Sequence, residues 1–276
     1  MWKSDPGLDD VMRDLSAVDA LLDKLVSESS VAHNSLYQAA RYSLLAPGKR
    51  IRPLLAISTG KMLGSSLEAL LHPACALEMI HTYSLIHDDL PAMDDDDFRR
   101  GKPSLHKAFG EGNAILVGDY LLTYAFEVLS LAPLLTDQQR LQLITLLAQA
   151  SGGDGMIGGQ IMDLAKAGHS LEEVNAKKTG ALICAAVQFG GVVAKANSEV
   201  FSSLTLLGQK IGLLFQVCDD ILDEERSSDL NQALQEAHTL YKDSLTLLHR
   251  IPGDPTDLKT LFKSIIKQIE PQATFN

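Results

Sequence analysis

The sequence predicts an all-α fold, and three observations support this prediction. No proline occurs between Pro133 and Pro252, and Leu, Ala, Gln, Lys and Glu dominate that stretch, as is typical of helices. Aromatic residues, which are enriched in strands, make up only 5% of the 276 residues. Asn-Gly or Asp-Gly turns between alternating strands are missing. These features exclude an all-β protein.

Glycine and proline divide the chain into a series of helices. A short connection, Ala46-Pro47-Gly48, follows the second helix, and Pro91 disfavours helical geometry at Leu90, which ends the fourth. The segment 251–255, which contains two prolines, precedes the last helix. The helices are expected at 8–27, 33–45, 50–63, 66–90, 113–131, 136–152, 155–167, 171–196, 198–224, 229–250 and 256–269. Because no Pro/Ser-rich linker interrupts them, we expect a single domain, 1–276, with one helical core.

Charge and cysteine content limit the partners and the compartment. Twenty-four Lys+Arg against 35 Asp+Glu give a net charge of -11, which argues against a nucleic-acid partner. Three cysteines without metal-type spacing predict reduced core thiols. Residues 1–7 lack the apolar core of a secretion signal, and no later run approaches the roughly 20 uncharged apolar residues that cross a bilayer. We expect a cytoplasmic protein with no stable membrane insertion.

An acidic pair ends the predicted helix 198–224. Asp219 and Asp223 are four residues apart, so they lie on one face of the helix, where like charges destabilise it. A divalent cation would compensate, because Mg²⁺ prefers oxygen ligands and often bridges to phosphate groups. A solvated acidic helix end is the alternative.

A second acidic cluster follows the predicted helix 66–90. Six aspartates occur within ten residues, from Asp88 to Asp97, and Phe98-Arg99-Arg100-Gly101-Lys102 follows at once. Because Pro91 ends the helix near Asp89, a bulge is expected to bring Asp94 next to Asp88. Charge runs are usually solvated, but acid followed by base could serve both a metal and a phosphate.

Further positive charge is concentrated at 48–53 and at Lys177-Lys178. Either segment alone would be interpreted as a surface patch. Together with two acidic clusters they predict a site that holds more than one phosphate group, with metals on one side and Lys/Arg on the other. His81 lies seven residues before Asp88 on the same helical face, where it could contact the ligand or could simply be a core histidine.

These segments, in this order, resemble one family, the trans-prenyltransferases or short-chain isoprenyl diphosphate synthases (polyprenyl synthetases). The resemblance covers about residues 33–223. The matching segments are Gly48-Lys49-Arg50-Ile51-Arg52-Pro53, the acidic motif 78–97 with Phe98-Arg99-Arg100-Gly101, Gly118-Asp119-Tyr120-Leu121, the glycine-rich segment 155–164, Lys178-Thr179-Gly180-Ala181-Leu182 and Phe215 to Asp223.

The resemblance implies an isoprenoid-synthase fold, with antiparallel helices around a central apolar cavity, and a homodimer. It implies Mg²⁺, three ions with bound diphosphate, which stabilises the pyrophosphate leaving group as isopentenyl diphosphate adds to an allylic diphosphate. The metal ligands would be Asp88, Asp94 and Asp219, supported by Asp89 and Asp223. The allylic diphosphate would contact Arg99, Lys178 and Gln216, isopentenyl diphosphate would contact Lys49, Arg52, His81 and Arg100, and Thr179 would lie beside the reacting carbons.

Product length is implied by the residues four and five positions before the first aspartate, Ser84 and Tyr83, which help form the cavity floor in this family. An aromatic Tyr83 with the Pro91-Ala92 expansion resembles bacterial farnesyl diphosphate synthases. A small residue in its place would favour geranylgeranyl diphosphate, which remains the alternative product. Tyr83 could also be an ordinary core residue.

The chain departs from the family after Asp223, where a lysine- and glycine-rich lid is normal and Glu224 to Asp229 stands instead. Either the lid is partly absent, or a mobile lid is missing from the sequence at this point; the intact upstream motifs favour the second explanation. A true deletion would favour a non-catalytic regulatory homologue.

Three other functions explain the sequence less well. Terpene cyclases and head-to-head synthases do not need Lys49, Arg52 and His81, so the presence of this set argues against them. An acidic metal-buffering protein would leave the arginines unexplained.

Overall fold

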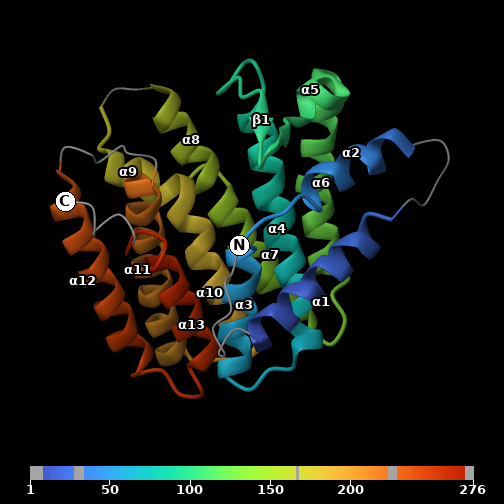
Figure 1. Cartoon of the computed structure of the whole chain (residues 1–276). Helices are drawn as coiled ribbons and strands as arrows, with labels where there is room; N and C mark the ends of the chain where they lie inside the picture. Colours follow the sequence, from blue (N-terminus) through green and yellow to red (C-terminus); the bar gives the residue numbers. More distant parts are fainter. Residues whose placement is uncertain (1–8, 28–33, 166–167, 223–228, 271–276) are drawn as a thin grey trace.

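Helices account for almost all of the regular structure in the computed structural model (Figure 1), which describes residues 9–27, 34–165, 168–222 and 229–270. The all-α prediction is confirmed, and the main helices lie where the sequence predicts them. They are α1 (Asp9–Leu25), α2 (Asn34–Leu44), α3 (Ile51–Met62), α4 (Leu67–Asp88), α6 (Glu111–Ser130), α7 (Asp137–Ser151), α8 (Met156–Ala165), α10 (Ala181–Val193), α11 (Ser198–Leu222), α12 (Leu230–Leu248) and α13 (Thr256–Ile266).

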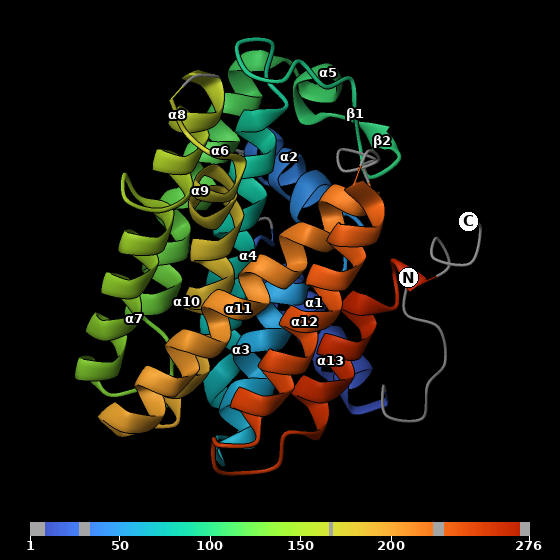
Figure 2. The same ribbon diagram turned by 90° about the vertical axis from the view of Figure 1, so that its left-hand side faces the viewer.

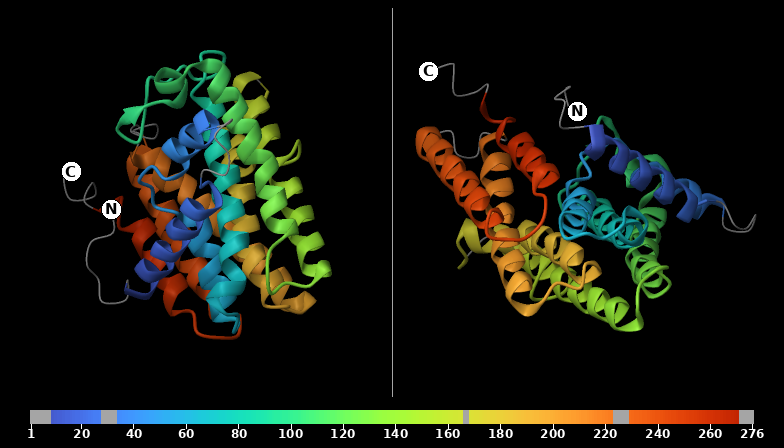
Figure 3. Two further views of the ribbon diagram at one scale, coloured as in Figure 1. Left: turned by 90° about the vertical axis from the view of Figure 1, so that its right-hand side faces the viewer. Right: turned by 90° about the horizontal axis from the view of Figure 1, so that it is seen from below.

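The centre of the bundle is formed by α3, α4 and α10. Every residue of α3 except Lys61 is buried; α4 packs most extensively against α6, and α10 against α11 and α3. Phe189 and Phe262 are among the largest fully buried side chains, and full burial of such a side chain is worth about 1.5–3 kcal/mol. Seen from below, α12 and α13 lie on one side of this centre and α6 and α7 on the other (Figure 3).

Shorter elements that the sequence did not predict are concentrated in two places. A two-stranded antiparallel hairpin, β1 (Phe98–Arg99) and β2 (Lys102–Pro103), and a short helix, α5 (Leu105–Phe109), follow the acidic cluster. The predicted helix 171–196 is interrupted, because α9 (Leu171–Asn175) and α10 are joined by a π-helix, η3 (Ala176–Gly180). Two-residue strands carry no periodic signal, and π-helices often mark functional sites.

Among the described residues one helix, α11, is long and apolar enough to cross a membrane by length and composition. Lys210 interrupts it, so it contains no run of about 20 uncharged apolar residues. The helix packs along α10 and α12 within the bundle, and its apolar face is the one turned to those neighbours. A core helix of a soluble protein passes the same test of length and composition.

The arrangement places the motifs at one end of the bundle. The C-terminal ends of α4 and α11 both rise towards the β1–β2 hairpin, which lies at the top of the bundle together with α5 and α8 (Figure 2). The acidic segments, which end these two helices, are therefore brought to the same end although about 130 residues separate them in the sequence.

Candidate active site

The first acidic cluster forms a tight turn directly after α4. The Asp94 N–H donates a 2.9 Å hydrogen bond to the Asp88 carbonyl, and the Met93 N–H donates to the Leu90 carbonyl at 2.8 Å. The predicted bulge is therefore present, and it brings Asp94 back beside Asp88. The Asp88 side chain is partly buried and Asp94 is exposed.

The electrostatic environment of Asp88 disfavours its ionised form. Burial raises the pKa of Asp88 to about 6; Lys178 partly offsets this rise, and the Asp94 carboxylate adds to it. A nearby cation favours the ionised carboxylate, so an ion bound here would reverse the shift. Asp88 thus has the properties of a metal ligand, because a bound cation would stabilise its ionised form.

This environment predicts that Asp88→Asn raises, or at least does not lower, the melting temperature in EDTA at pH 7.5. A carboxyl whose pKa is higher in the folded state than in the unfolded state destabilises the fold fully above the folded value, and the effect disappears below the unfolded value. The difference between variant and wild type should therefore close as the pH falls from about 6 to 4. Calorimetric scans across this range test the prediction, and a constant difference would contradict it.

Asp89, next in sequence, has a different environment. Its carboxylate is only 2% exposed and accepts a 2.8 Å hydrogen bond from Arg99 Nε and a second one from Arg99 Nη2. Arg99 also contacts Asp96 at 2.7 Å. Burial raises the pKa of Asp89, and Arg99 opposes this rise. In this structure Asp89 therefore orients Arg99, and a supporting contact to metal stays a prediction.

Arg100 is presented by the hairpin. Arg100 (φ 54°) and Gly101 (φ 76°) are the two central residues between β1 and β2, and two positive φ values suit a tight two-residue hairpin turn. Left-handed backbone is unusual for arginine. The guanidinium lies against the backbone of Gly48, where a Cβ atom would be 3.0 Å from Arg100 Nη1. The hairpin thus carries Arg100 to the basic segment 48–53.

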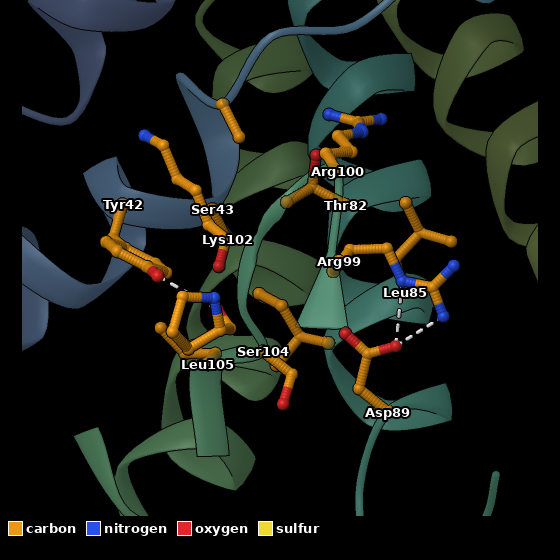
Figure 4. A pocket seen from close by; sticks show the side chains of 13 residues that line it. Tyr42, Ser43, Thr82, Leu85, Asp89, Arg99, Arg100, Lys102, Ser104 and Leu105 are labelled. Atoms are coloured by element: carbon orange, nitrogen blue, oxygen red, sulfur yellow. Dashed lines mark hydrogen bonds and ion pairs between the residues drawn. The ribbon is translucent and has the colours of Figure 1, made fainter. Parts of the chain in front are cut away.

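A small cavity of about 30 Å³ lies beneath the hairpin. Arg99 and Asp89 face each other at one side of it, and Arg100 and Thr82 lie at another (Figure 4). The hairpin is fixed to α2 by the Tyr42 hydroxyl, which donates a 2.8 Å hydrogen bond to the Pro103 carbonyl. Both arginines line this cavity.

Arg52, in the first turn of α3, is a buried guanidinium. It is 8% exposed, and among the described residues no acceptor reaches its Nε. Burial lowers the pKa of Arg52 to about 10, although Glu78 and Asp219 oppose the shift. The influence of Asp219 shows that the end of α11 lies close to α3. An incompletely bonded, buried guanidinium is suited to an anionic ligand.

Lys49 and His81 complete the predicted basic group. Lys49 is exposed and donates a hydrogen bond to Gln268 Oε1 near the C-terminal end of the described chain. Burial, followed by Arg52 and Arg100, lowers the pKa of His81 well below its usual value. His81 is therefore neutral at pH 7 and offers a hydrogen bond instead of a charge.

The π-helix η3 presents Lys178 and Thr179 between two glycines of neighbouring helices. A Cβ atom on Gly159 of α8 would lie 2.3 Å from the Lys178 nitrogen, and one on Gly212 of α11 would lie 3.0 Å from the Gly180 Cα. Glycine at 159 is required for this close approach, and glycine at 212 makes the contact on the other side easier. The Lys178 ammonium is 2.6 Å from Asp163 of α8.

The second acidic motif is only partly described. Gln216 Nε2 donates a 2.6 Å hydrogen bond to Asp220, which is 1% exposed, whereas Asp219 is partly buried. Asp223 lies outside the described residues, as do 224–228 of the predicted lid. Seven residues, 223–229, separate α11 from α12 in the sequence.

The structure therefore unites most of the predicted site. Lys178 and Arg99 act on Asp88, and Asp219 and Arg100 act on Arg52, so residues of α3, α4, β1, η3 and α11 share one region. Within the described ranges no three metal-ligating side chains gather closely enough to hold an ion. The carboxylate oxygens fit Mg²⁺, which is commonly held by one or two carboxylates together with waters and substrate phosphates.

Tyr83 and Ser84 lie on α4 ahead of the acidic cluster. Tyr83 is 4% exposed, and its ring meets the His87 ring edge-on with centroids 5.8 Å apart. The Ser84 hydroxyl donates a 2.9 Å bond to the His81 carbonyl, which turns it back onto its own helix. Tyr83 is thus the bulkier of the two groups below the acidic end.

Three residues close to the site were not assigned a role from the sequence. Arg50 and Glu78 form a buried ion pair at 2.6 Å, and Asp163 binds Lys178. All three lie within the quoted motifs, so the motifs themselves were the available signal. Their roles depend on partners distant in the sequence, which spacing cannot reveal.

Comparison with known proteins identifies what the chain resembles. A family model described as polyprenyl synthetase matches residues 33–274. A farnesyl diphosphate synthase of Haemophilus influenzae is 42% identical over 259 residues, covering 83% of this chain and 88% of the relative. A chloroplastic geranylgeranyl pyrophosphate synthase of Arabidopsis thaliana is 44% identical over 222 residues, covering 78% and 63%. The crystal structure of a geranyltransferase from Legionella pneumophila has a TM-score of 0.89 and 36% identity, covering 96% of this chain and 98% of that one.

Proposed function

The chain belongs to the polyprenyl synthetase family, and from this premise we propose that it condenses isopentenyl diphosphate with dimethylallyl and geranyl diphosphate, giving farnesyl diphosphate and pyrophosphate. It is a prenyltransferase with the isoprenoid-synthase fold. One observation carries the proposal: carboxylates from α4 and α11 flank the buried Arg52 and the partly buried Arg100 at one end of the bundle.

The metal half of the site would consist of Asp88, Asp94 and Asp219, with Asp89 and Asp223 in support. These carboxylates would hold Mg²⁺, three ions when diphosphate is bound, and the ions would neutralise the charge that develops on the leaving pyrophosphate. Arg99, Lys178 and Gln216 would orient the allylic diphosphate, and Lys178 can leave Asp163 because that contact is partly solvent-exposed.

The second half would hold isopentenyl diphosphate. Arg52 supplies a buried positive charge and Arg100 a partly buried one, Lys49 adds an exposed ammonium, and the neutral His81 supplies a hydrogen bond. Buried guanidinium groups pair bidentately with phosphate oxygens. The low exposure of Arg52 predicts that this half binds a diphosphate without needing a metal.

In the reaction the allylic carbon–oxygen bond breaks and both electrons leave with pyrophosphate. The isopentenyl double bond attacks the cation, a carbon–carbon bond forms, and a proton is lost to the departing pyrophosphate. The main-chain carbonyls of Lys178 and Thr179 and the Gln216 amide would face the positive charge. The Gln216–Asp220 hydrogen bond fixes this amide before substrate arrives.

The short link at 223–229 favours a second candidate, a non-catalytic homologue. The basic lid that the family resemblance implies has no counterpart in these seven residues. Such a homologue would keep the fold and bind diphosphates but turn over weakly without a partner. Geranylgeranyl diphosphate remains the alternative product, since relatives of both product classes are similar to this chain.

Location and assembly are part of the proposal. The three thiols, Cys75, Cys184 and Cys218, are free, and burial raises the pKa of each, in keeping with a reducing cytoplasm. Ile115 and Leu116 on α6 and Leu141 on α7 are 45% to 65% exposed. Apolar side chains in such positions support a homodimer through these helices, which light scattering on the purified protein tests.

The proposal is tested by incubating the full chain with Mg²⁺, isopentenyl diphosphate and one primer at a time: dimethylallyl, geranyl or farnesyl diphosphate. Mass spectrometry of the products should show farnesyl diphosphate from the first two primers and little extension of the third. Geranylgeranyl diphosphate as the main product would select the alternative. No product from any primer, together with measurable diphosphate binding, would favour the non-catalytic homologue.

A further inference from the structure

We propose that the buried ion pair between Arg50 and Glu78 is the positioning device of the isopentenyl diphosphate half of the site. The inference rests on the proposed function. Neither residue binds substrate in this scheme. Instead, the pair joins the two segments that carry the substrate-binding side chains and fixes their separation.

Arg50 makes four hydrogen bonds to the protein. Its Nη1 donates to Glu78 Oε1 at 2.6 Å, its Nε donates to Asp19 Oδ1 at 3.0 Å, and its Nη2 donates to the carbonyls of Leu44 at 2.8 Å and Ala46 at 3.1 Å. These partners belong to α1, α4 and the end of α2. The side chain is 2% exposed. Four of its five N–H groups are bonded to the protein and the side chain is buried, so Arg50 is not accessible to a ligand.

The backbone of Arg50 depends on these contacts. It has φ 48° and ψ 38° and directly precedes α3, and the Leu54 N–H donates a 3.0 Å hydrogen bond to its carbonyl. Left-handed geometry at a residue other than glycine is unfavourable and persists only when the surroundings enforce it. Lys49 stands immediately before this turn and Arg52 two residues after it. Relaxation at Arg50 would therefore move both.

Glu78 connects the same point to the other substrate-binding groups. It is 1% exposed and lies three residues before His81, on the same side of α4. Its charge acts on Arg50, Arg52 and Arg100 alike. Asp19, the second carboxylate on Arg50, is half-exposed. Glu78 is thus the buried counter-charge that the three arginines share.

The allylic half of the site is held by different contacts. Lys178 is positioned by the glycines around η3 and by Asp163, and Arg99 by Asp89. Loss of the Arg50–Glu78 pair should therefore disturb one substrate and spare the other. A general loss of stability would affect both substrates equally.

The test uses Glu78→Gln, which keeps the shape and one acceptor oxygen but removes the charge. We expect the KM for isopentenyl diphosphate to rise roughly tenfold or more, since small misplacements of binding groups have large effects, while the KM for geranyl diphosphate changes less than about twofold. Calorimetric binding of isopentenyl diphosphate alone should weaken in parallel. This second readout needs no turnover, so it separates failure of the inference from failure of the proposed activity.

Asp14→Asn is the matched control. Asp14 is equally buried, at 3% exposed, and pairs at 2.8 Å with Lys61 at the other end of the same helix α3. This variant should lose stability without changing the ratio of the two KM values. If Glu78→Gln does not fold, Asp19→Asn is the substitute variant. It removes the half-exposed carboxylate that bonds Arg50, and it should shift the ratio of the two KM values in the same direction by a smaller factor. Equal changes in both KM values, or unaltered isopentenyl diphosphate binding, would overturn the inference.

Discussion

Replacing Asp219 or Asp88 by Asn is expected to lower kcat/KM for the condensation by roughly 10³-fold, because each variant removes a negative charge from the group that holds the metal. The side chains keep their size, so the helices should be unaffected. Steady-state assays with Mg²⁺ titrated into the mixture measure the effect. The two variants should resemble each other although the residues lie on α4 and α11.

A matched control is offered by Asp95→Asn in the same acidic turn. Asp95 is exposed and has φ 52°, a conformation that Asn tolerates well. The variant makes the same change of charge within seven residues of Asp88, but at a position outside the ligand set. It should keep kcat/KM within about threefold of wild type. Near-normal activity in Asp88→Asn or Asp219→Asn would remove the metal-binding model, and a large loss in Asp95→Asn would show that only total charge matters.

The long helices could be predicted from the sequence. Helices such as α4 and α11 contain more than twenty residues that are mostly apolar, and Pro91 follows the end of α4. The β1–β2 hairpin was missed because two-residue strands have no period. The π-helix was missed because its signal lies in Gly159 and Gly212, which belong to other helices and allow close approach only after folding.

The sequence predicts which residues make up the site, but not which role each of them has. Asp88 and Asp89 are adjacent and chemically identical, yet one is partly buried beside Asp94 and the other is bonded by Arg99. Arg50 and Arg52 differ in the same way: Arg50 makes four hydrogen bonds, whereas the Nε of Arg52 has no acceptor among the described residues. Residue type gives the chemistry of a motif, whereas the partners from other helices decide which member is free to act.

Replacing Tyr83 by Ala should lengthen the product by one or more five-carbon units. In the proposed reaction the growing tail would extend from the acidic end along α4, where it would meet the Tyr83 ring, which packs edge-on against His87. Removing a buried aromatic ring opens space and costs about 3–5 kcal/mol of stability, so the assay should run well below the melting temperature of the variant. Product lengths from dimethylallyl diphosphate, measured by mass spectrometry, give the answer.

Tyr83→Phe separates the bulk of the ring from its hydroxyl. The hydroxyl is buried and has no hydrogen-bond partner in the part of the chain that the structure describes, and burial raises the pKa of Tyr83 to about 12. Removing an unsatisfied hydroxyl should stabilise the protein by about 1 kcal/mol and leave the product unchanged. If the ring limits chain length, only the Ala variant makes longer products. If both variants keep the original product, the cavity ends at another residue, and if both lengthen it, the hydroxyl and not the bulk sets the limit.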